Sequence, residues 1–353
     1  HGTARYGTVR HGTVRYGTVR RLATRVALAT LPVAAAGCQA PMSTLTGGGD
    51  AGRRVAALTW FLIIAAAVVY AGTMALFVAG LARNRDRDPS AVDLTERGTG
   101  FIVWGGGVMP AVVLTVVFVV GLLAMGRFPA EASERAPHFT ITGHQWWWQV
   151  DYDDPDLPGS FTTANELHVP VGQTVRIRLV SADVIHSFWV PGLQGKIDLI
   201  PGDTNEIRIH AEKAGTYRGQ CAEFCGMQHA NMAFTVVADS PESYAAWIAG
   251  QQAVAKDPVD SLAAAGRELF TGGPCAMCHT VRGTNARAQV APDLTHVGSR
   301  LTLAAGTLPN DLGTMEAWIA NAQSLKPGAK MPTLTQFNGR ELRAVAHYLE
   351  SLK

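Results

Sequence analysis

Two long apolar runs dominate the pattern of hydrophobic and polar positions in the first third of the chain. Residues 55–81 and 101–126 contain no Asp, Glu, Lys or Arg. Each run exceeds the ~20 residues that an α-helix needs to cross about 30 Å of hydrocarbon. We therefore predict a two-helix transmembrane hairpin within residues 50–128. Arg is equally frequent between the spans and outside them, so positive charge alone does not set the orientation.

The pattern changes to a period of two in residues 137–238. Segments such as 174–180 (TVRIRLV) and 205–210 (NEIRIH) alternate apolar and polar residues and are separated by turns. This alternation predicts an all-β domain built as an antiparallel sandwich or barrel. Residues 239–258 follow as a helical linker. The last unit, residues 259–353, is expected to be helical, because the apolar residues of 339–352 fall on one helical face.

The first 37 residues have a different character. Four near-identical pentads fill positions 1–20 without hydrophobic periodicity, and we interpret them as a low-complexity extension. Three Arg residues between positions 20 and 25 then precede a short apolar run and Gly37-Cys38, an order typical of a signal peptide. This ending resembles the lipobox of bacterial lipoproteins, which implies that Cys38 is lipidated and becomes the first residue of the mature chain.

Composition narrows the possible functions. Hydrophobic residues make up 47% of the chain and charged residues 16%, which excludes a disordered protein and agrees with helices in a lipid bilayer. Six of the 30 Lys and Arg lie in the first 25 residues, where no Asp or Glu occurs, so the rest of the chain carries 24 basic and 28 acidic residues. Without a basic excess, we expect no nucleic-acid partner.

A sulfur-rich cluster in residues 221–232 (CAEFCGMQHANM) predicts a metal centre. It combines Cys221, Cys225, His229 and Met232, and soft sulfur together with imidazole selects copper over harder cations. Because a mononuclear blue-copper site uses one Cys, the second Cys indicates two copper ions bridged by two thiolates. His186 is the candidate for a second imidazole in a cupredoxin-like domain. A zinc half-site and a redox-active Cys pair are the alternatives.

A second cofactor motif lies in the last unit. Cys275-Ala-Met-Cys278-His279 is the attachment motif for c-type haem, in which the two thiols bond the porphyrin and the His becomes an axial iron ligand. Met331 lies 52 residues after His279 and offers a thioether as the other axial ligand of the iron. A zinc site is the alternative for the motif alone. Haem c is attached outside the cytoplasm, so this unit is expected on the outer face of the membrane, with both ends of the hairpin on that side.

Together these motifs resemble subunit II of cytochrome c oxidase, of the class with a fused cytochrome c domain. The resemblance rests on GHQWWW (143–148), VIHSFWVP (184–191), KIDLIPG (196–202) and the Cys-x3-Cys cluster, after two apolar spans. It implies a dinuclear CuA centre held by six residues: His186, Cys221, the carbonyl of Glu223, Cys225, His229 and Met232. It also implies a magnesium ion at the Glu223 carboxylate, shared with the catalytic subunit, and electron entry at Trp146.

The resemblance implies a function for the whole chain. Electrons would pass from a cytochrome c or bc1-type donor through haem c and CuA to catalytic subunit I, which reduces O2 to water and pumps protons, with subunit III as a further partner. The expected location is the bacterial inner membrane. One alternative is the CuA subunit of a nitric oxide reductase. The other is a membrane-tethered electron carrier that acts without an oxidase.

Overall fold

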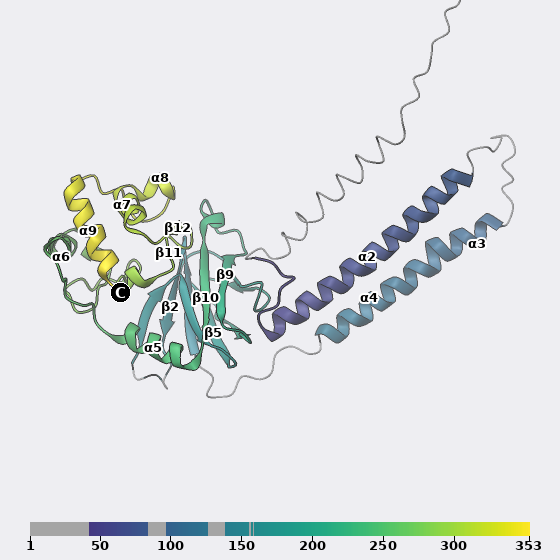
Figure 1. The fold of residues 1–353 in the computed structure, drawn as a ribbon, viewed down its shortest axis with the longest axis horizontal. Helices are drawn as coiled ribbons and strands as arrows, with labels where there is room; N and C mark the ends of the chain where they lie inside the picture. Colours follow the sequence, from purple (N-terminus) through teal and green to yellow (C-terminus); the bar gives the residue numbers. More distant parts are fainter. Residues whose placement is uncertain (1–41, 84–96, 126–137, 155–156, 158) are drawn as a thin grey trace, which may run out of the picture.

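The computed structural model describes residues 42–83, 97–125, 138–154, 157 and 159–353. Figure 1 shows two long helices, a β-sandwich and a small helical domain, with the sandwich between the other two parts. Cys38 and the low-complexity segment lie outside the described residues, so the structure does not bear on the lipidation of Cys38. The apolar helices, the β-sandwich and the helical domain agree with the fold class predicted from the sequence.

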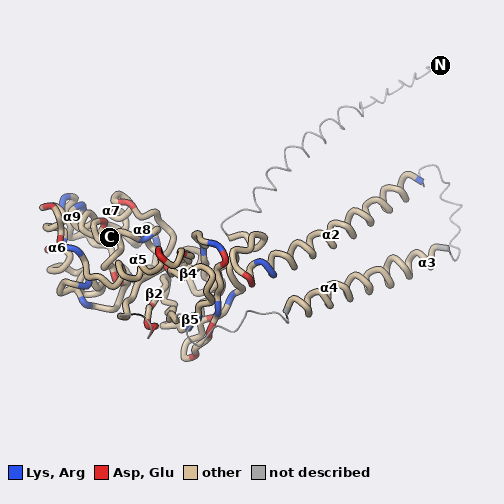
Figure 2. Tube along the Cα trace, turned by 60° about the horizontal axis from the view of Figure 1, so that its bottom comes forward, with Lys and Arg blue, Asp and Glu red and all other residues tan. Residues whose placement is uncertain are grey.

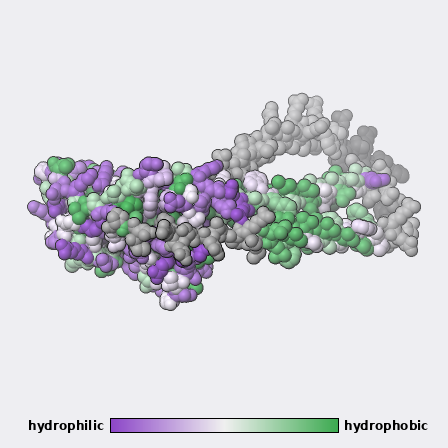
Figure 3. All heavy atoms as spheres, turned by 90° about the horizontal axis from the view of Figure 1, so that it is seen from below, coloured by the Kyte–Doolittle hydropathy of each residue, from purple (hydrophilic) through white to green (hydrophobic). Residues whose placement is uncertain are grey.

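The two apolar helices are long enough to span a membrane. The first is α2 (Asp50–Arg83), and the second runs from α3 (Arg97–Val103) through a π-helical turn, η2 (Trp104–Val108), into α4 (Met109–Met125). The wide turn directly precedes Pro110, whose missing N–H and bulky ring disfavour a regular α-helix there. The candidate spans are Asp50–Arg83 and Gly98–Ala124. Figure 3 shows a hydrophobic surface along both, and Figure 2 shows charges only near their ends.

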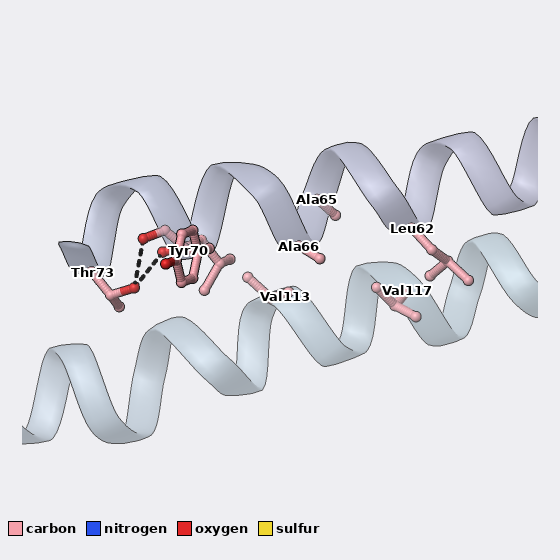
Figure 4. Close-up of a pocket in the computed structure, with 8 residues that line it drawn as sticks. Leu62, Ala65, Ala66, Tyr70, Thr73, Val113 and Val117 are labelled. Carbon is pink, nitrogen blue, oxygen red and sulfur yellow. Dashed lines mark hydrogen bonds between the residues drawn. The ribbon is translucent and has the colours of Figure 1, made fainter. Parts of the chain in front are cut away.

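The two helices face each other across a pocket lined mainly by apolar side chains. Figure 4 shows Ala65 and Ala66 of α2 opposite Val113 and Val117 of α4. The Thr73 hydroxyl at this contact is satisfied within its own helix, because Thr73 Oγ1 donates to the carbonyls of Val69 and Tyr70 at 2.8 and 2.9 Å. The hairpin therefore presents an apolar exterior that suits a lipid or protein environment.

The β-sandwich contains ten strands in two sheets. One sheet has the order β3-β2-β1-β5-β8 and the other has the order β4-β10-β9-β6-β7. The strands are β1 (His138–His144), β2 (Trp147–Tyr152), β3 (Phe161–Ala164), β4 (Glu166–Pro170), β5 (Thr174–Ser181), β6 (His186–Trp189), β7 (Ile197–Leu199), β8 (Asn205–His210), β9 (Gly215–Cys221) and β10 (Ala233–Asp239).

The sheets are mixed, which differs from the expected antiparallel arrangement. Strands β1 and β5 pair in parallel, as do β4 and β10, whereas the other pairs are antiparallel. In β1 and β2 alternate residues point inward, so Phe139, Ile141, Trp148 and Val150 are at most 2% exposed. A period of two is common to strands in both kinds of pairing, so the residue pattern did not distinguish them.

The first helix begins directly on the sandwich. The amide N–H of Gly48 donates to Gly192 O at 2.7 Å and that of Gly52 donates to Leu193 O at 3.1 Å. A Cβ at Gly52 would lie 2.3 Å from Gly192 O, so only glycine permits this approach. Arg53 adds an ion pair with Glu212 at 2.7 Å. These contacts fix the β-domain at one end of the hairpin.

The helical domain follows a linker helix. The linker is α5 (Pro241–Gln252), and the domain consists of α6 (Ser261–Gly272), a short β11 (Thr302–Leu303) and β12 (Leu308–Pro309) pair, α7 (Leu312–Ala320), α8 (Ala322–Leu325) and α9 (Gly339–Ser351). Ser240, Asp260, Asp311 and Asn338 cap four of the helices. Helices α6 and α9 pack closely, because a Cβ at Gly266 would lie 2.0 Å from Ala344 O.

Candidate metal and haem sites

One end of the second sheet gathers the predicted copper ligands. Cys221 is the last residue of β9, and His186 is the first residue of the neighbouring β6, in which Phe188 pairs with Cys221. The loop after β9 returns through a short 3-10 turn, η3 (His229–Asn231), and closes where Cys221 N donates to Met232 O at 2.9 Å. The loop and the sheet thus bring residues 35 positions apart to one place.

All six predicted copper ligands converge there. The sulfurs of Cys221 and Cys225 lie 3.8 Å apart, and Cys221 Sγ lies 3.2 Å from Glu223 O and 4.0 Å from His186 Nδ1. Cys225 Sγ lies 3.6 Å from His229 Nδ1 and 3.8 Å from Met232 Sδ. Within the described part of the chain, His186, Cys221 and Cys225 form the one group of three His, Cys, Asp or Glu side chains arranged to hold a metal.

The two thiols share their electrostatic environment. The hydrogen bond with Cys225, opposed by burial, lowers the pKa of the Cys221 thiol well below its usual value, while the hydrogen bond with Cys221 and burial raise the pKa of Cys225. The pair by itself therefore favours one negative charge. Two adjacent thiolates require positive charge between them, and copper ions bridging the sulfurs would supply it.

His186 is held by a residue that the sequence did not indicate. Its Nδ1 faces Cys221, and its Nε2 lies 2.8 Å from Asp183 Oδ1. Asp183 also accepts hydrogen bonds from the backbone N–H of Gln145 at 2.7 Å and of Val184 at 2.8 Å. Burial opposes protonation of His186, but hydrogen bonds with Cys221 and Asp183 outweigh burial and raise its pKa. A carboxylate behind a ligating imidazole is the usual way in which proteins orient such a ligand.

Trp146 lies directly over the loop of the cluster. Its Nε1 donates to Cys225 O at 2.9 Å, and Gln145 Nε2 donates to the same oxygen at 2.8 Å. A Cβ at Gly226, where φ is +112°, would lie 3.1 Å from Trp146 Cζ2. The indole therefore contacts the loop next to a cluster sulfur, whereas Trp148 is buried in the sandwich and Trp147 stacks on His144.

The helical domain arranges the haem motif as an axial-ligand site requires. Cys275 and Cys278 are both free thiols in and beside the turn η4 (Pro274–Met277). His279 Nδ1 lies 2.7 Å from Pro292 O, which leaves Nε2 as the lone-pair nitrogen, and burial lowers the pKa of His279 and favours the neutral imidazole. A neutral imidazole with its Nδ1–H on a carbonyl suits iron ligation.

Met331 lies in a loop that side-chain hydrogen bonds hold in place. Gln323 Nε2 donates to Met331 O at 2.7 Å, and the Met331 side chain packs against the same apolar cluster as Cys275 and Leu294. One motif thiol and the thioether thus border one core, and with the neutral imidazole of His279 the residues present fit a covalently bound haem. The carboxylate of Glu223 belongs to no described group of metal-binding side chains, so magnesium at that residue remains an expectation.

Comparisons with known proteins agree with this arrangement. The family of the cytochrome c oxidase subunit II periplasmic domain matches residues 138–239, and the cytochrome c family matches residues 263–353. Subunit 2 of cytochrome c oxidase from Alkalihalophilus pseudofirmus is 36% identical over 300 residues, which cover 82% of this chain and 85% of the relative. The Bacillus subtilis subunit 2 is 29% identical over 348 residues, with coverages of 92% and 96%.

Among solved structures, the periplasmic domain of subunit II of cytochrome oxidase from Bradyrhizobium japonicum is 32% identical. The match covers 35% of the present chain and 96% of the Bradyrhizobium japonicum domain, with a TM-score of 0.32. The first domain match implies a CuA copper centre, and the second implies haem c. The chain belongs to the cytochrome c oxidase subunit II family and carries a C-terminal cytochrome c domain.

Proposed function

We propose that this chain is the electron-input subunit of a proton-pumping haem-copper oxidase. When bound, haem c and CuA supply one-electron chemistry, which carries electrons from a donor through haem c and CuA to the catalytic subunit that reduces O2 to water. Cys275, Cys278, His279 and Met331 hold the haem in this proposal. The six-residue cluster described above holds the two copper ions.

The contact between the haem domain and the copper loop carries this proposal. The segment that leads to Met331 lies on Trp146, because a Cβ at Gly328 would lie 3.6 Å from two ring carbons of that indole. Trp146 in turn donates to Cys225 O. Gln228 of the copper loop donates to Pro327 O at 2.8 Å. A short chain of contacts therefore joins a proposed haem ligand to a proposed copper ligand, with Trp146 between them.

Covalent linkage of the two domains favours internal electron transfer. The linker between sandwich and haem domain is about twenty residues long, and such a tether gives an effective concentration near millimolar even without specific contacts. In the described structure Gly328 of the cytochrome domain lies against the Trp146 ring. A separate cytochrome c or bc1-type donor is then expected to deliver electrons to haem c, and not to Trp146 directly.

The names of the relatives favour an oxidase over the alternatives. Both relatives described above are subunits 2 of cytochrome c oxidase, so a role in nitric oxide reductase has no specific support. A tethered carrier would need one anchor, whereas this chain has two candidate spans. We place the chain in the bacterial inner membrane, with both cofactor domains on the outer face, beside subunits I and III, a magnesium ion at Glu223 and a lipid on Cys38.

Replacement of Met331 by Leu in the intact complex tests the proposed route. Loss of the thioether is expected to lower the haem c potential, and CuA reduction by the physiological donor should slow, while copper content stays at the level of the unmodified protein. Stopped-flow absorbance that follows haem c and CuA separately measures both steps. If the haem c potential fell in the variant but CuA was reduced at an unchanged rate, haem c would not be the point at which electrons enter this chain.

A further inference from the structure

One lysine of the haem domain is buried in the contact with the copper domain. Lys326 follows the short helix α8 and precedes Met331 by five residues, and it is 3% exposed. Lysine side chains are rarely buried to this extent unless they are paired. Within the described residues, no carboxylate lies within ion-pair distance of Lys326, and its partners are therefore of another kind.

The partners of Lys326 are three backbone carbonyls from three separate segments. Its Nζ donates to Trp146 O at 2.8 Å, to Asn231 O at 2.8 Å and to Ala304 O at 2.9 Å. Two of these oxygens belong to the copper domain and one belongs to the haem domain. An ammonium group has three N–H donors and no acceptor, so three carbonyls match its hydrogen-bonding capacity.

Each carbonyl belongs to a segment that matters for electron transfer. Trp146 contacts the copper loop through Cys225 O, and Asn231 directly precedes the proposed copper ligand Met232. Ala304 lies in a turn that is joined to the copper domain next to Met232, because Ala233 N donates to Ala305 O at 2.9 Å. Lys326 thus connects the haem loop, the entry tryptophan and the copper loop at a single atom.

We propose that Lys326 is the positioning residue that fixes the haem domain on the copper domain, with the 326–331 loop held against Trp146 for electron transfer. This inference rests on the proposed route from haem c to CuA. The carbonyl contacts favour a single docked arrangement, because an ammonium group that left this site would lose three hydrogen bonds, of which Thr307 Oγ1 can replace only those to Asn231 O and Ala304 O. Burial lowers the pKa of Lys326 to about 7, which reflects the cost of desolvating the amine and makes the three hydrogen bonds necessary.

The neighbouring Lys330 offers a matched control. It lies in the same loop and faces the same domain, but it is 68% exposed and forms an ion pair of 3.6 Å with Asp183. Exposed ion pairs of this kind contribute little to stability. Lys326→Met and Lys330→Met therefore remove the same charge and keep a similar chain length at two positions that differ in burial and in partners.

The experiment uses the complete oxidase complex with each variant. Haem c is reduced rapidly by a photoactivated ruthenium compound, and the arrival of the electron at CuA is followed by absorbance. Lys326→Met should slow this internal step at least about tenfold, which corresponds to ~1.4 kcal/mol, whereas Lys330→Met should change it less than about threefold. The haem c and CuA potentials and the copper signal should stay unchanged in both variants, which a general folding defect would not allow.

A second measurement does not depend on electron transfer. Hydrogen exchange followed by mass spectrometry should show faster exchange of peptides covering 226–232 and 326–331 in Lys326→Met and not in Lys330→Met. If Lys326→Met does not assemble, Lys326→Gln keeps a donor and should give an intermediate rate. An unchanged internal rate in either Lys326 variant would overturn the positioning role. If Met331→Leu slows CuA reduction while Lys326→Met does not, the proposed route stands and only the role of Lys326 fails.

Discussion

Replacement of Asp183 by Asn should weaken copper binding without removing any copper ligand. Asp183 holds His186 Nε2 at 2.8 Å and accepts two backbone N–H groups, from Gln145 and Val184. The Asn side chain has one acceptor oxygen and one NH2 donor. In either orientation of the Asn side chain, its NH2 group would face a donor from which the carboxylate now accepts a hydrogen bond, so at least one of these hydrogen bonds is lost.

The magnitude follows from those contacts. A hydrogen bond to a charged group contributes about 1.5–3 kcal/mol, and loss of the group behind a ligating His commonly weakens metal affinity by about 10–100-fold, or ~1.4–2.7 kcal/mol. The two ranges agree, because His186 is 0% exposed and water cannot replace the lost partner. We therefore expect copper affinity to fall by about 10–100-fold in Asp183→Asn.

Competition for copper against a chelator of known affinity measures this effect in the intact complex. Asp203→Asn is the matched control, because Asp203 also accepts a backbone N–H, from Thr204 at 2.7 Å, but is exposed and forms no hydrogen bond with a residue of the copper cluster in the described structure. The control should bind copper as the unmodified protein does. Equal copper affinity of Asp183→Asn and the unmodified chain would refute the role of Asp183 as the support of His186.

Two further predictions concern the haem domain. Gly266→Ala should lower the free energy of unfolding of the haem domain by about 1–3 kcal/mol, because the new Cβ would lie 2.0 Å from Ala344 O. A Cβ at Gly272 would have nothing within 4 Å, so the control Gly272→Ala should change the free energy of unfolding by less than about 0.5 kcal/mol. A denaturant titration measures both values. Burial lowers the pKa of His296 below 6.5 in spite of its hydrogen bond to Ala253 O, so the unfolded state binds more protons and stability should fall as the pH drops below about 6.5. Denaturation at several pH values should show a weaker decline in His296→Gln, and an equal decline in both proteins would contradict this assignment.

The proposed copper ligands could be selected from the sequence because their chemistry is local. Cys221, Cys225, His229 and Met232 fall within twelve residues, and no common structural role requires that combination. His186 could be added because its segment belongs to a family pattern. The structure brings all of them together around two sulfurs 3.8 Å apart.

Asp183 and Lys326 could not be predicted in the same way. Asp183 is a turn residue three positions before His186, and only the folded turn directs its Oδ1 to the imidazole. A lysine in a Lys-Pro-Gly segment is expected in solvent, and the burial of Lys326 arises only when two separately encoded domains meet. The periodicity of apolar residues predicts which face of a single helix or strand is buried, whereas the roles of Asp183 and Lys326 depend on contacts between separate elements.

The contacts between the two domains involve residues that lie next to the proposed copper ligands. Asp183 supports His186 and also forms an ion pair with Lys330, the residue before Met331. Lys326 binds the carbonyl of Trp146, and Trp146 binds the carbonyl of Cys225. The Met331 loop therefore reaches the surroundings of two proposed copper ligands: weakly near His186, through the exposed Lys330–Asp183 pair, and more firmly near Cys225, through the buried Lys326 and Trp146. Because the exposed Lys330 pair contributes little, docking depends mainly on Lys326, and loss of Lys326 is expected to slow electron transfer while contacts within the copper domain still hold the copper ligands.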